Sequence, residues 1–473
     1  MNNSGGATIS PDLVPDELYQ PSSWQYKGEG NSNIILTYIG ELDNFKLTVL
    51  RLRKSEEEKK DALNINNNSG GFSNKQDEQQ DNSIQSSSID PQTFTVFYVR
   101  DVIAPLIGTE HTSELALLRV TPTFLQKLSK SISSHRSSNR VNKDIDLKQR
   151  YAILSPDYTK FQSNNSSSSK QQESPTNTIS IEIKPKWAFI PTSTHIAASN
   201  SIKRKTCRFC MHQYYKHKTT TTAVVTDYCP LDLFSLKEDR LRRAIGALIS
   251  TPVNNFKLFV DGLLVDLAKT NWQLLLKGFF VHEKNGTNTL NEDNDNDNAS
   301  KITEYLITLL TATILKEHIL FSRLKHLQKT LDELDIEGIM KLLSSPTSSS
   351  SSYIQQLFAV EPSLEEWRTA SLRYLERIEK HTGNGTLQSS NFNDNNGSSN
   401  EKPLMDDAEI KQRILEFLFS TTLKDSILKL DYYHDLDMKI VRNFLDYIKK
   451  ELEETDDNSH SVFLGANKRK CFE

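Results

Sequence analysis

The stretch TISIEIKPK, residues 178–186, decides the fold class because the pattern of the chain changes there. Ile179, Ile181 and Ile183 alternate with polar residues, which predicts a strand with one apolar face that ends at Pro185. The chain before this stretch reads mainly as strands, and the chain after it reads mainly as helices. We therefore expect an α+β protein with a sheet-bearing lobe followed by a larger, mostly helical lobe.

Three strands are expected in the first third of the chain. Runs of apolar, β-favouring residues predict two of them at 33–39 and 46–53, joined by a short hairpin loop at 40–44. A similar run predicts a third strand at 94–99. Together these strands would supply the sheet of the first lobe.

Helices are expected after Thr121 and throughout the second half. Thr121 and Pro122 predict an N-cap and first turn of a helix that runs to about residue 131. Ser363 and Glu366 form the pattern of a capping box. The spacing of apolar residues predicts the later helices at 236–250, 301–327, 364–380, 406–419 and 437–453.

Five segments are rich in Asn, Ser, Asp and Gln, and we predict that they are disordered insertions, because they bury too little apolar surface to offset the entropy of ordering. The folded remainder would form an N-lobe over 20–157 and a C-lobe over 178–456. The predicted insertions are 62–90, 163–177, 284–300, 344–352 and 383–402.

The composition excludes several classes of protein. Four cysteines in 473 residues do not make a disulfide framework, and the N-terminus lacks the apolar core of a secretory signal. The longest apolar stretch, 302–315, is too short and too polar to span a bilayer. We expect a monomer located in the nucleus, with the cytoplasm as the alternative, and the basic tail at 467–470 agrees with nuclear import.

Residues 183–226 contain no Asp or Glu, although the whole chain has a formal net charge of −4. A local basic excess in an acidic chain focuses a field on a polyanion, and it is unlike a general nucleic-acid binder, so we expect no sequence-specific nucleic-acid partner. The alternative is a solvated, Lys-rich loop. The cations of this stretch are Lys184, Lys186, Lys203, Arg204, Lys205, Arg208, Lys216 and Lys218.

Two segments of the first lobe have the residue types that bind phosphate. The loop 28–33, GEGNSN, has two glycines that let successive amides approach phosphate oxygens, although an ordinary turn has the same pattern. Arg51 lies in VLRLRK, residues 49–54, on the strand after that loop, where a cation can reach a nucleotide phosphate. The alternative for this strand is an edge guarded by charge.

Candidate groups for phosphoryl transfer also occur later in the chain. Lys184 and Lys186 flank a proline and present two point charges. Asp425 and Asp431 belong to a late group of acids that could orient an alcohol or hold Mg²⁺, and the alternative is a solvated cluster that caps a helix.

Three cysteines leave two interpretations open. Cys207 and Cys210 form a C-x-x-C pair, and Cys229 follows downstream. Together they could begin a zinc site. The favoured alternative is that they are buried thiols, which are common in intracellular chains.

Taken together and in this order, these segments resemble the inositol-pentakisphosphate 2-kinase family, and the Asn/Ser-rich insertions resemble a yeast-type fungal member. The combination of the three central stretches is the most specific part of the resemblance. The matching stretches are GEGNSN (28–33), VLRLRK (49–54), EIKPKWAF (182–189), CRFCMHQ (207–213), YCPLDLFS (228–235), TPVNNFKLFVDG (251–262) and LKDS (423–426).

The resemblance implies a kinase-like, two-lobed fold that uses ATP and Mg²⁺. The reaction it implies is transfer of the γ-phosphate to the 2-hydroxyl of inositol 1,3,4,5,6-pentakisphosphate, which gives inositol hexakisphosphate. It places the ATP phosphates at the glycine loop and adenine at a hinge over 153–157. The residues that it assigns to ATP are Gly28, Gly30, Asn31, Ser32, Asn33, Arg51 and Asp157.

For the second lobe, the resemblance implies that Asp425 is the catalytic acid residue, assisted by Lys184, and that Asp425 and Asp431 hold Mg²⁺. The residues that it assigns to the inositol phosphate are Lys184, Lys186, Arg208, His212, Asn255, Lys429 and Tyr433.

One stretch departs from the family pattern. The family has an Asp-Leu-Asp-Leu-Lys-Pro strand after the LKDS-type segment, whereas here Leu428 to Tyr433 follow almost at once. Either Asp431 and Lys429 substitute for the missing pair, or the chain lacks a segment, or it is a catalytically impaired relative that binds inositol phosphates as a scaffold or sensor. The chain has no His-Arg-Asp or Asp-Phe-Gly motif, which argues against a protein kinase.

Overall fold

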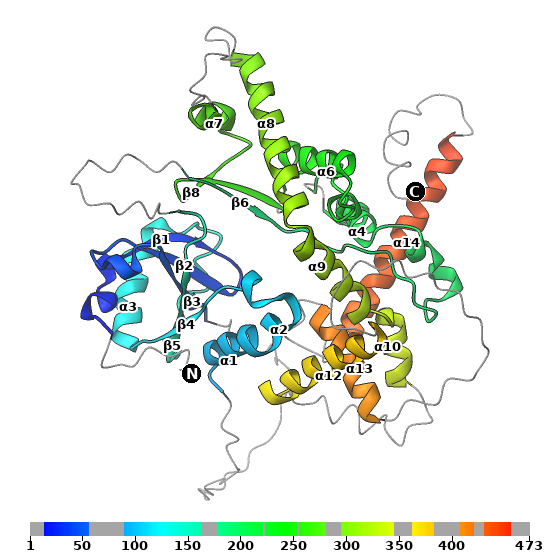
Figure 1. Ribbon diagram of the computed structural model, residues 1–473, viewed down its shortest axis with the longest axis horizontal. Coiled ribbons are helices and arrows are strands. Elements are labelled where there is room, and N and C mark those ends of the chain that lie inside the picture. Colours follow the sequence, from blue (N-terminus) through cyan, green and yellow to red (C-terminus); the bar gives the residue numbers. More distant parts are fainter. Residues whose placement is uncertain are drawn as a thin grey trace, which may run out of the picture. The chain divides into compact units, whose positions relative to one another are not determined.

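The computed structural model describes residues 14–55, 89–161, 178–220, 223–253, 255–280, 295–344, 362–382, 407–420 and 430–455 (Figure 1). The fold is α+β, as the sequence predicts. The chain divides into two compact units, each with its own sheet. The first unit comprises residues 1–100 and 112–162, and the second comprises 101–111 and 163–473.

The first unit contains a five-stranded antiparallel sheet in the order β1-β2-β3-β5-β4. The two strands predicted at 33–39 and 46–53 are confirmed as β2 and β3. The strands are β1 (Trp24–Glu29), β2 (Asn33–Tyr38), β3 (Thr48–Arg53), β4 (Ala116–Arg119) and β5 (Tyr151–Pro156).

Helix α3 (Pro122–Ile132) packs its apolar face against the core of this unit. The Thr121 hydroxyl accepts a hydrogen bond from the Phe124 amide at 3.2 Å, so the predicted N-cap is confirmed. Leu125 and Leu128 are fully buried in the same cluster as the strand residue Leu50.

The strand predicted at 94–99 is wrong, because this segment lies in helix α1 (Pro91–Tyr98) and the π-helical turn after it. Aromatic and β-branched residues favour strands, but the helix start overrides them here. Asp90 accepts hydrogen bonds from the amides of Gln92 and Thr93 at 3.0 and 3.2 Å, and Pro91 takes the first helical position. Asp90 therefore belongs to the folded unit and not to the predicted insertion at 62–90.

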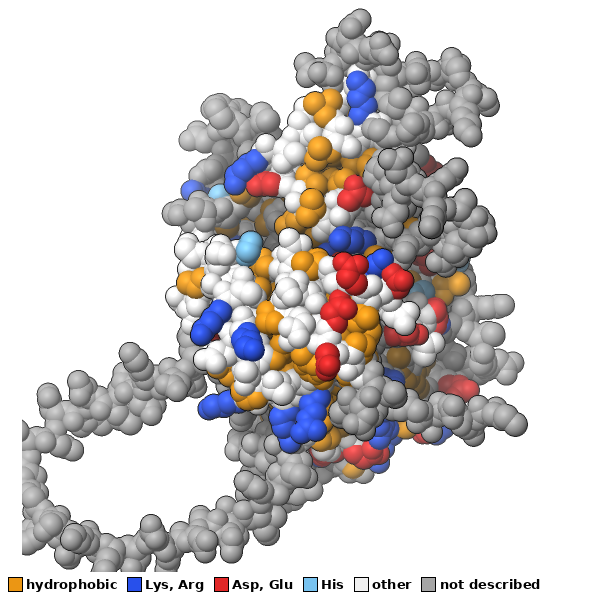
Figure 2. Space-filling model, turned by 90° about the vertical axis from the view of Figure 1, so that its left-hand side faces the viewer, with side chains coloured by type: hydrophobic (Ala, Val, Ile, Leu, Met, Phe, Trp, Pro, Cys, Tyr) orange, Lys and Arg blue, Asp and Glu red, His pale blue; other side chains and the backbone are white. Residues whose placement is uncertain are grey.

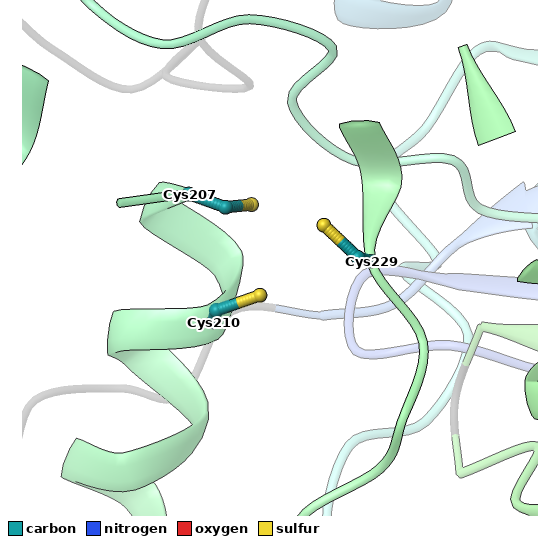
Figure 3. A group of neighbouring side chains, drawn as sticks. All are labelled: Cys207, Cys210 and Cys229. Carbon is teal, nitrogen blue, oxygen red and sulfur yellow. The ribbon is translucent and has the colours of Figure 1, made fainter. Parts of the chain in front are cut away.

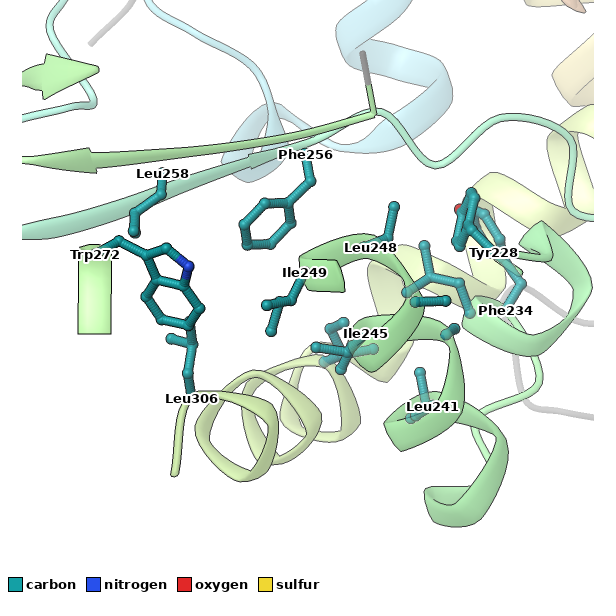
Figure 4. Packing of buried hydrophobic residues seen from close by; sticks show 14 of the residues in the cluster. Tyr228, Phe234, Leu241, Ile245, Leu248, Ile249, Phe256, Leu258, Trp272 and Leu306 are labelled. Carbon is teal, nitrogen blue, oxygen red and sulfur yellow. The ribbon is translucent and has the colours of Figure 1, made fainter. Parts of the chain in front are cut away.

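The second unit contains an antiparallel three-stranded sheet, β6 (Ile179–Ile183), β7 (Phe256–Val260) and β8 (Leu263–Val265). The strand predicted over TISIEIK is confirmed, and its isoleucines pack on the main core of the unit. Asp261 and Gly262, with φ of 50° and 81°, form the tight turn between β7 and β8. In Figure 4, Phe256 and Leu258 project from β7 into a core shared with Ile249 and Trp272.

Helices pack against the apolar face of this sheet and continue to the C-terminal end of the described chain (Figure 1). The capping box is confirmed, because Ser363 and Glu366 exchange hydrogen bonds of 2.8 to 3.3 Å. The helices are η8 (Ala198–Arg204), α4 (Arg208–Thr219), α5 (Pro230–Leu233), α6 (Glu238–Ser250), α7 (Trp272–Phe280), α8 (Asp295–Lys316), α9 (His318–Leu331), α10 (Asp335–Ser344), α12 (Leu364–Thr382), α13 (Asp407–Ser420) and α14 (Leu430–Thr455).

Two expectations for the helices need correction. The helix predicted at 301–327 is two helices, α8 and α9, which separate at Glu317, so a continuous apolar pattern does not mark the break. Residues 295–300, predicted to be part of an insertion, form the first turns of α8. Their entropy cost is offset because the helix continues into Ile302 and Leu306, which are buried. The remaining predicted insertions lie almost entirely outside the described residues.

No single helix in the described part of the chain is long and apolar enough to cross a bilayer. Among the described helices, the consecutive pair Asp297–Lys316 and His318–Ser344, bent by 69°, reaches that length and composition when the two are taken together.

Candidate functional site

The glycine loop of the first unit is a turn between β1 and β2 that is open on its outer side. The Gly30 amide donates to the carbonyl of Asn33 at 2.9 Å, which closes the turn. A Cβ added to Gly28 or Gly30 would meet no atom within 4 Å among the described residues. The turn therefore leaves space into which a phosphate can approach the backbone, as the sequence predicts for a phosphate loop.

Glu29 anchors this loop from its inner side. Arg136 donates to both carboxylate oxygens of Glu29, at 3.2 and 2.9 Å, and Lys54 forms a second ion pair with it. All three side chains are at most 4% exposed. Burial would raise the pKa of Glu29, but the bonds from Arg136 and Lys54 outweigh burial and hold that pKa below its usual value. The Asn31 side chain, predicted to contact ATP, accepts a bond from Arg140 at 2.9 Å.

Arg51 and Arg53 of β3, and Lys54 directly after it, differ in their contacts. Lys54 is bound to Glu29, and Arg53 pairs with Asp146 at 3.4 Å. Arg51 makes no ion pair or hydrogen bond through its side chain with any described residue, and burial lowers its pKa. Arg51 is therefore the cation of this strand that remains available for an anionic ligand, which agrees with the role that the sequence assigns to it.

Asp157, predicted to lie in an adenine hinge, is a buried cross-link within the first unit. Its carboxylate accepts hydrogen bonds from Lys27 at 2.8 Å, Thr37 at 3.2 Å and the Thr159 hydroxyl at 2.6 Å. Burial would raise its pKa, but the bonds from Lys27 and Thr159 lower it below the usual value. A bulge in β1 between Tyr26 and Gly28 precedes the glycine loop on the same strand as Lys27.

A cavity of about 1100 Å³ lies within the second unit. On the molecular face drawn in Figure 2, Lys and Arg side chains form several small, separate groups. The cavity instead concentrates cations in one place. The predicted site residues that line it are Lys186, Arg208, His212, Asn255 and Tyr433.

Helix α4 positions three of the basic side chains of this cavity. Arg208, His212 and Lys216 are four residues apart, which places them on one face of the helix. Burial, followed by repulsion from Lys216 and Lys186, lowers the pKa of His212 to about 4. Lys216 was not among the predicted site residues, although the spacing of four was a visible signal.

The end of β6 brings Lys186 to the cavity. Lys186 has a left-handed backbone, with φ of 64°, directly after Pro185. Gln328 of α9 holds this segment by accepting from the Ala188 amide at 2.8 Å and donating to the Lys186 carbonyl at 3.2 Å. Burial, Lys216 and Lys184 together lower the pKa of Lys186. Its side chain has no hydrogen bond or ion pair with any residue of the described ranges.

Asn255 supplies a neutral group to the same cavity. Its carbonyl accepts a bond from the Lys184 amide at 2.8 Å, which ties β6 to the loop before β7. The residue is only 5% exposed, yet its side-chain amide makes no hydrogen bond within the described part of the chain. Because Asn255 lines the cavity, its amide can hydrogen-bond a ligand there. Lys184 itself does not line the cavity and lies 3.7 Å from Glu182.

Some predicted residues are not placed. Asp425 and Lys429 lie outside the described residues, and Asp431 is in the first turn of α14, where its side chain is not described. Whether Asp431 and Lys429 substitute for the missing family pair stays a prediction.

Residues 183–226 contain no Asp or Glu, but carboxylates from other parts of the chain contact some of their cations in the folded protein. Lys203 is 1% exposed and contacts three carboxylates from distant parts of the chain, at 2.5, 3.2 and 2.6 Å. Arg204 donates to the carbonyls of Ser193 and Ile196 at 2.8 and 3.0 Å. These two cations therefore stabilise the fold, and the expectation that the whole run serves a polyanion needs correction.

Figure 3 shows the sulfur atoms of three cysteines directed toward one another. Cys207 precedes α4, Cys210 lies in its first turn, and Cys229 precedes α5. The three sulfur atoms lie within 4.8 Å of one another, and none of these cysteines forms a disulfide. The arrangement fits three ligands of a soft metal ion.

An open glycine loop in one unit and a cation-rich cavity in the other are features of a protein that binds phosphorylated ligands. A family model described as inositol-pentakisphosphate 2-kinase matches residues 26–431. The Arabidopsis thaliana inositol-pentakisphosphate 2-kinase is 32% identical over 333 residues, which is 67% of this chain and 68% of that protein.

Similar relatives occur in other lineages. A protein of the same name from Oryza sativa subsp. indica is 33% identical over 322 residues, covering 67% of this chain and 68% of the relative. A Cryptococcus neoformans relative of that name is 26% identical over 353 residues, covering 72% and 70%. The chain belongs to the inositol-pentakisphosphate 2-kinase family, whose members are transferases.

Proposed function

We propose that this chain transfers the γ-phosphate of ATP to the 2-hydroxyl of inositol 1,3,4,5,6-pentakisphosphate and releases inositol hexakisphosphate and ADP. Its family membership supports this activity, and no observation favours the alternative of an impaired scaffold. The observation that carries the substrate class is the cavity of the second unit, where burial and the repulsion between Lys186 and Lys216 lower the pKa of Lys186. Such mutual repulsion is relieved when a ligand brings several negative charges.

The ATP phosphates would lie on the glycine loop of the first unit. The Gly28 and Gly30 positions leave room for close approach, and the Arg51 guanidinium supplies a positive charge without an internal partner among the described residues. Glu29 contacts Lys54 and Arg136 rather than the open side of the loop, so its charge is neutralised. Such a site would stabilise charge on the transferring phosphoryl group by position alone.

The inositol phosphate would lie in the cavity of the second unit. Lys186 and Lys216 are suited to phosphate groups as point charges, and the Asn255 amide can donate to a phosphate or hydroxyl oxygen. A bound polyanion would raise the pKa of His212. Once protonated, its imidazole ring would have two N–H donors in place of one. Two roles remain proposals from the sequence. Asp425 would accept the proton of the hydroxyl, and Asp425 and Asp431 would bind Mg²⁺.

The test is transfer of labelled γ-phosphate from ATP to inositol 1,3,4,5,6-pentakisphosphate, resolved by anion-exchange chromatography. We expect a product that elutes with inositol hexakisphosphate, and we expect Asp425→Asn to abolish it while substrate binding persists. Tight binding of the substrate by the wild-type protein without any product would instead support the scaffold.

We also propose that Cys207, Cys210 and Cys229 hold a zinc ion through their thiolates. The mutual distance of the sulfur atoms supports this, and no fourth His, Cys, Asp or Glu ligand completes the group within the described ranges. The metal would tie the start of α4 to the start of α5. About one zinc per chain by elemental analysis, lost in Cys229→Ser, is expected; a metal content well below one would favour buried thiols.

Nuclear location and a monomeric state are further proposals. The basic tail at 467–470, which agrees with nuclear import, lies outside the described residues.

A further inference from the structure

Six charged side chains meet beneath the cavity of the second unit. Lys203 of η8 contacts Asp335 at 2.5 Å and Asp437 at 2.6 Å. Arg208 of α4 contacts Asp335 at 3.0 Å and Asp332 at 3.3 Å, and its Nε lies 4.0 Å from Asp437. Glu337, which accepts from Lys203 at 3.2 Å, completes the group. The buried charge network is defined as Lys203, Arg208, Asp332, Asp335, Glu337 and Asp437.

This network joins elements that are far apart in the sequence. Asp335 begins α10 with a left-handed backbone, φ of 59°, and its carboxylate also accepts a bond from the Glu337 amide at 3.1 Å. The other carboxylate oxygen of Glu337 accepts from the Ala197 amide at 2.9 Å. Asp437 lies one turn after Tyr433 on α14. The network therefore fixes α14 against α4, η8 and α10.

Two members of the network also line the cavity, and Lys203 does not. Arg208 and Asp437 border the cavity beside Tyr433 and Leu436. The Arg208 guanidinium stacks on Trp187 at 4.7 Å and uses one N–H for Asp332 and one for Asp335. Three of its five N–H groups make no hydrogen bond among the described residues. Nε faces Asp437 at 4.0 Å, so the two terminal nitrogens each keep one N–H that can donate to a ligand.

We propose that Lys203 and Asp437 are positioning residues for the inositol phosphate, and this inference rests on the proposed function. Lys203 draws Asp437 and Asp335 together, Asp335 holds Arg208, and Asp437 holds α14, which carries Tyr433. Neither Lys203 nor the Asp437 atom that it binds needs to touch the ligand. Loss of this link would move Arg208 and Tyr433 relative to the rest of the cavity, and small displacements of binding groups weaken a polyanion site strongly.

A purely structural network is the competing explanation, and a matched control separates the two. Glu416 is 1% exposed in the same unit and pairs with Arg377 at 2.5 Å, but it does not line the cavity. Asp437→Asn leaves the buried Lys203, and Glu416→Gln the partly buried Arg377, with one carboxylate fewer. Both variants should lose stability, whereas only Asp437→Asn should change the binding of an inositol phosphate.

The experiment is calorimetric titration of the full-length protein with inositol hexakisphosphate, together with KM values for ATP and for inositol pentakisphosphate. For Asp437→Asn we expect Kd and the inositol substrate KM to rise about 10- to 100-fold, with the ATP KM within about twofold of wild type. If Asp437→Asn does not fold, Asp437→Glu replaces it, because it keeps the charge but displaces the carboxylate from Lys203, and we expect about a threefold rise in Kd.

Equal changes in Asp437→Asn and Glu416→Gln, or an unchanged Kd in a folded Asp437→Asn protein, would overturn the positioning role while leaving the proposed function intact. If Asp437→Glu has to be used, an unchanged Kd in that variant would overturn it as well. If wild-type protein binds neither inositol pentakisphosphate nor inositol hexakisphosphate and gives no transfer product, the proposed function is wrong and the positioning role falls with it.

Discussion

The cluster around Glu29 in the first unit and the buried charge network in the second differ in their balance of charge. Around Glu29, the carboxylates of Glu29 and Asp144 face the cations Lys54 and Arg136. In the network, four carboxylates face two cations of the described chain, Lys203 and Arg208. The first cluster is balanced, and the second has an excess of two negative charges when all its groups are ionised.

The imbalance has a visible consequence for protonation. The pKa of Glu29 is lowered and that of Arg136 is raised, so both charged forms are favoured. In the network, burial raises the pKa of Asp332 to about 7, despite the attraction of Arg208. One Asp332 oxygen is buried without a hydrogen-bond partner among the described residues. The balanced cluster therefore keeps its charges, and anchors the glycine loop, at any ordinary pH. In the unbalanced network, the protonation of Asp332 changes with pH.

Removing the charge at the centre of the balanced cluster should have the largest effect. Glu29→Gln leaves the buried Lys54 without its carboxylate and leaves Arg136 with Asp144 alone, so we expect a loss of about 3–5 kcal/mol in the free energy of unfolding. Because Glu29 anchors the glycine loop, the KM for ATP should also rise. Urea unfolding and steady-state kinetics measure both, and a variant of wild-type stability would show that the cluster is not a stabilising one.

Arg51 tests whether a cation without an internal partner behaves differently from those in the cluster. Arg51→Met should raise the KM for ATP about 30-fold with little change in stability, because it removes a charged hydrogen bond to phosphate only. The matched control is Arg53→Met on the same strand, which breaks the Asp146 pair and should leave the ATP KM near wild type. Equal KM values for both variants would contradict the assignment.

Asp332→Asn tests the pH response of the unbalanced network. The folded pKa of Asp332 lies above its ordinary value of 3.8. Its contribution to stability is therefore complete below pH 4 and is lost as the pH rises through about 7. The asparagine variant has no proton to lose, so its melting temperature relative to wild type should increase by about 3 °C between pH 5 and pH 7.5. A constant difference across that range would argue against the raised pKa.

The smallest effect is expected at the rim of the glycine loop. Arg140 bonds the Asn31 side chain in an exposed position, and exposed contacts of this kind contribute about 0–1 kcal/mol. Arg140→Ala should change the ATP KM by no more than about twofold. A tenfold change would show that the loop depends on its rim as well as on Glu29.

The sequence predicted local features better than spatial ones. Alternation predicted β6, and Ser363 with Glu366 predicted a helix start, because each signal is contained in a few neighbouring residues. The strand predicted at 94–99 was wrong. Aromatic and β-branched residues there favour a strand, but Asp90 and Pro91 start a helix.

The site shows the same limit. Family motifs predicted five residues that the structure brings to one cavity, and the spacing of Arg208, His212 and Lys216 on α4 was visible in the sequence. The carboxylates that hold Lys203 come from positions more than 130 residues away. The sequence alone does not show that these distant carboxylates neutralise some cations of the 183–226 stretch. That becomes visible only in the folded chain.

The central claim is that the cavity of the second unit, and not a diffuse basic surface, binds the inositol phosphate. The most direct test is calorimetric titration of inositol pentakisphosphate into wild type, Lys216→Ala and Lys205→Ala. Both lysines are exposed and belong to the same basic stretch, but only Lys216 lines the cavity. We expect Kd to rise at least about tenfold for Lys216→Ala and less than about twofold for Lys205→Ala. Equal weakening in the two variants would contradict the claim.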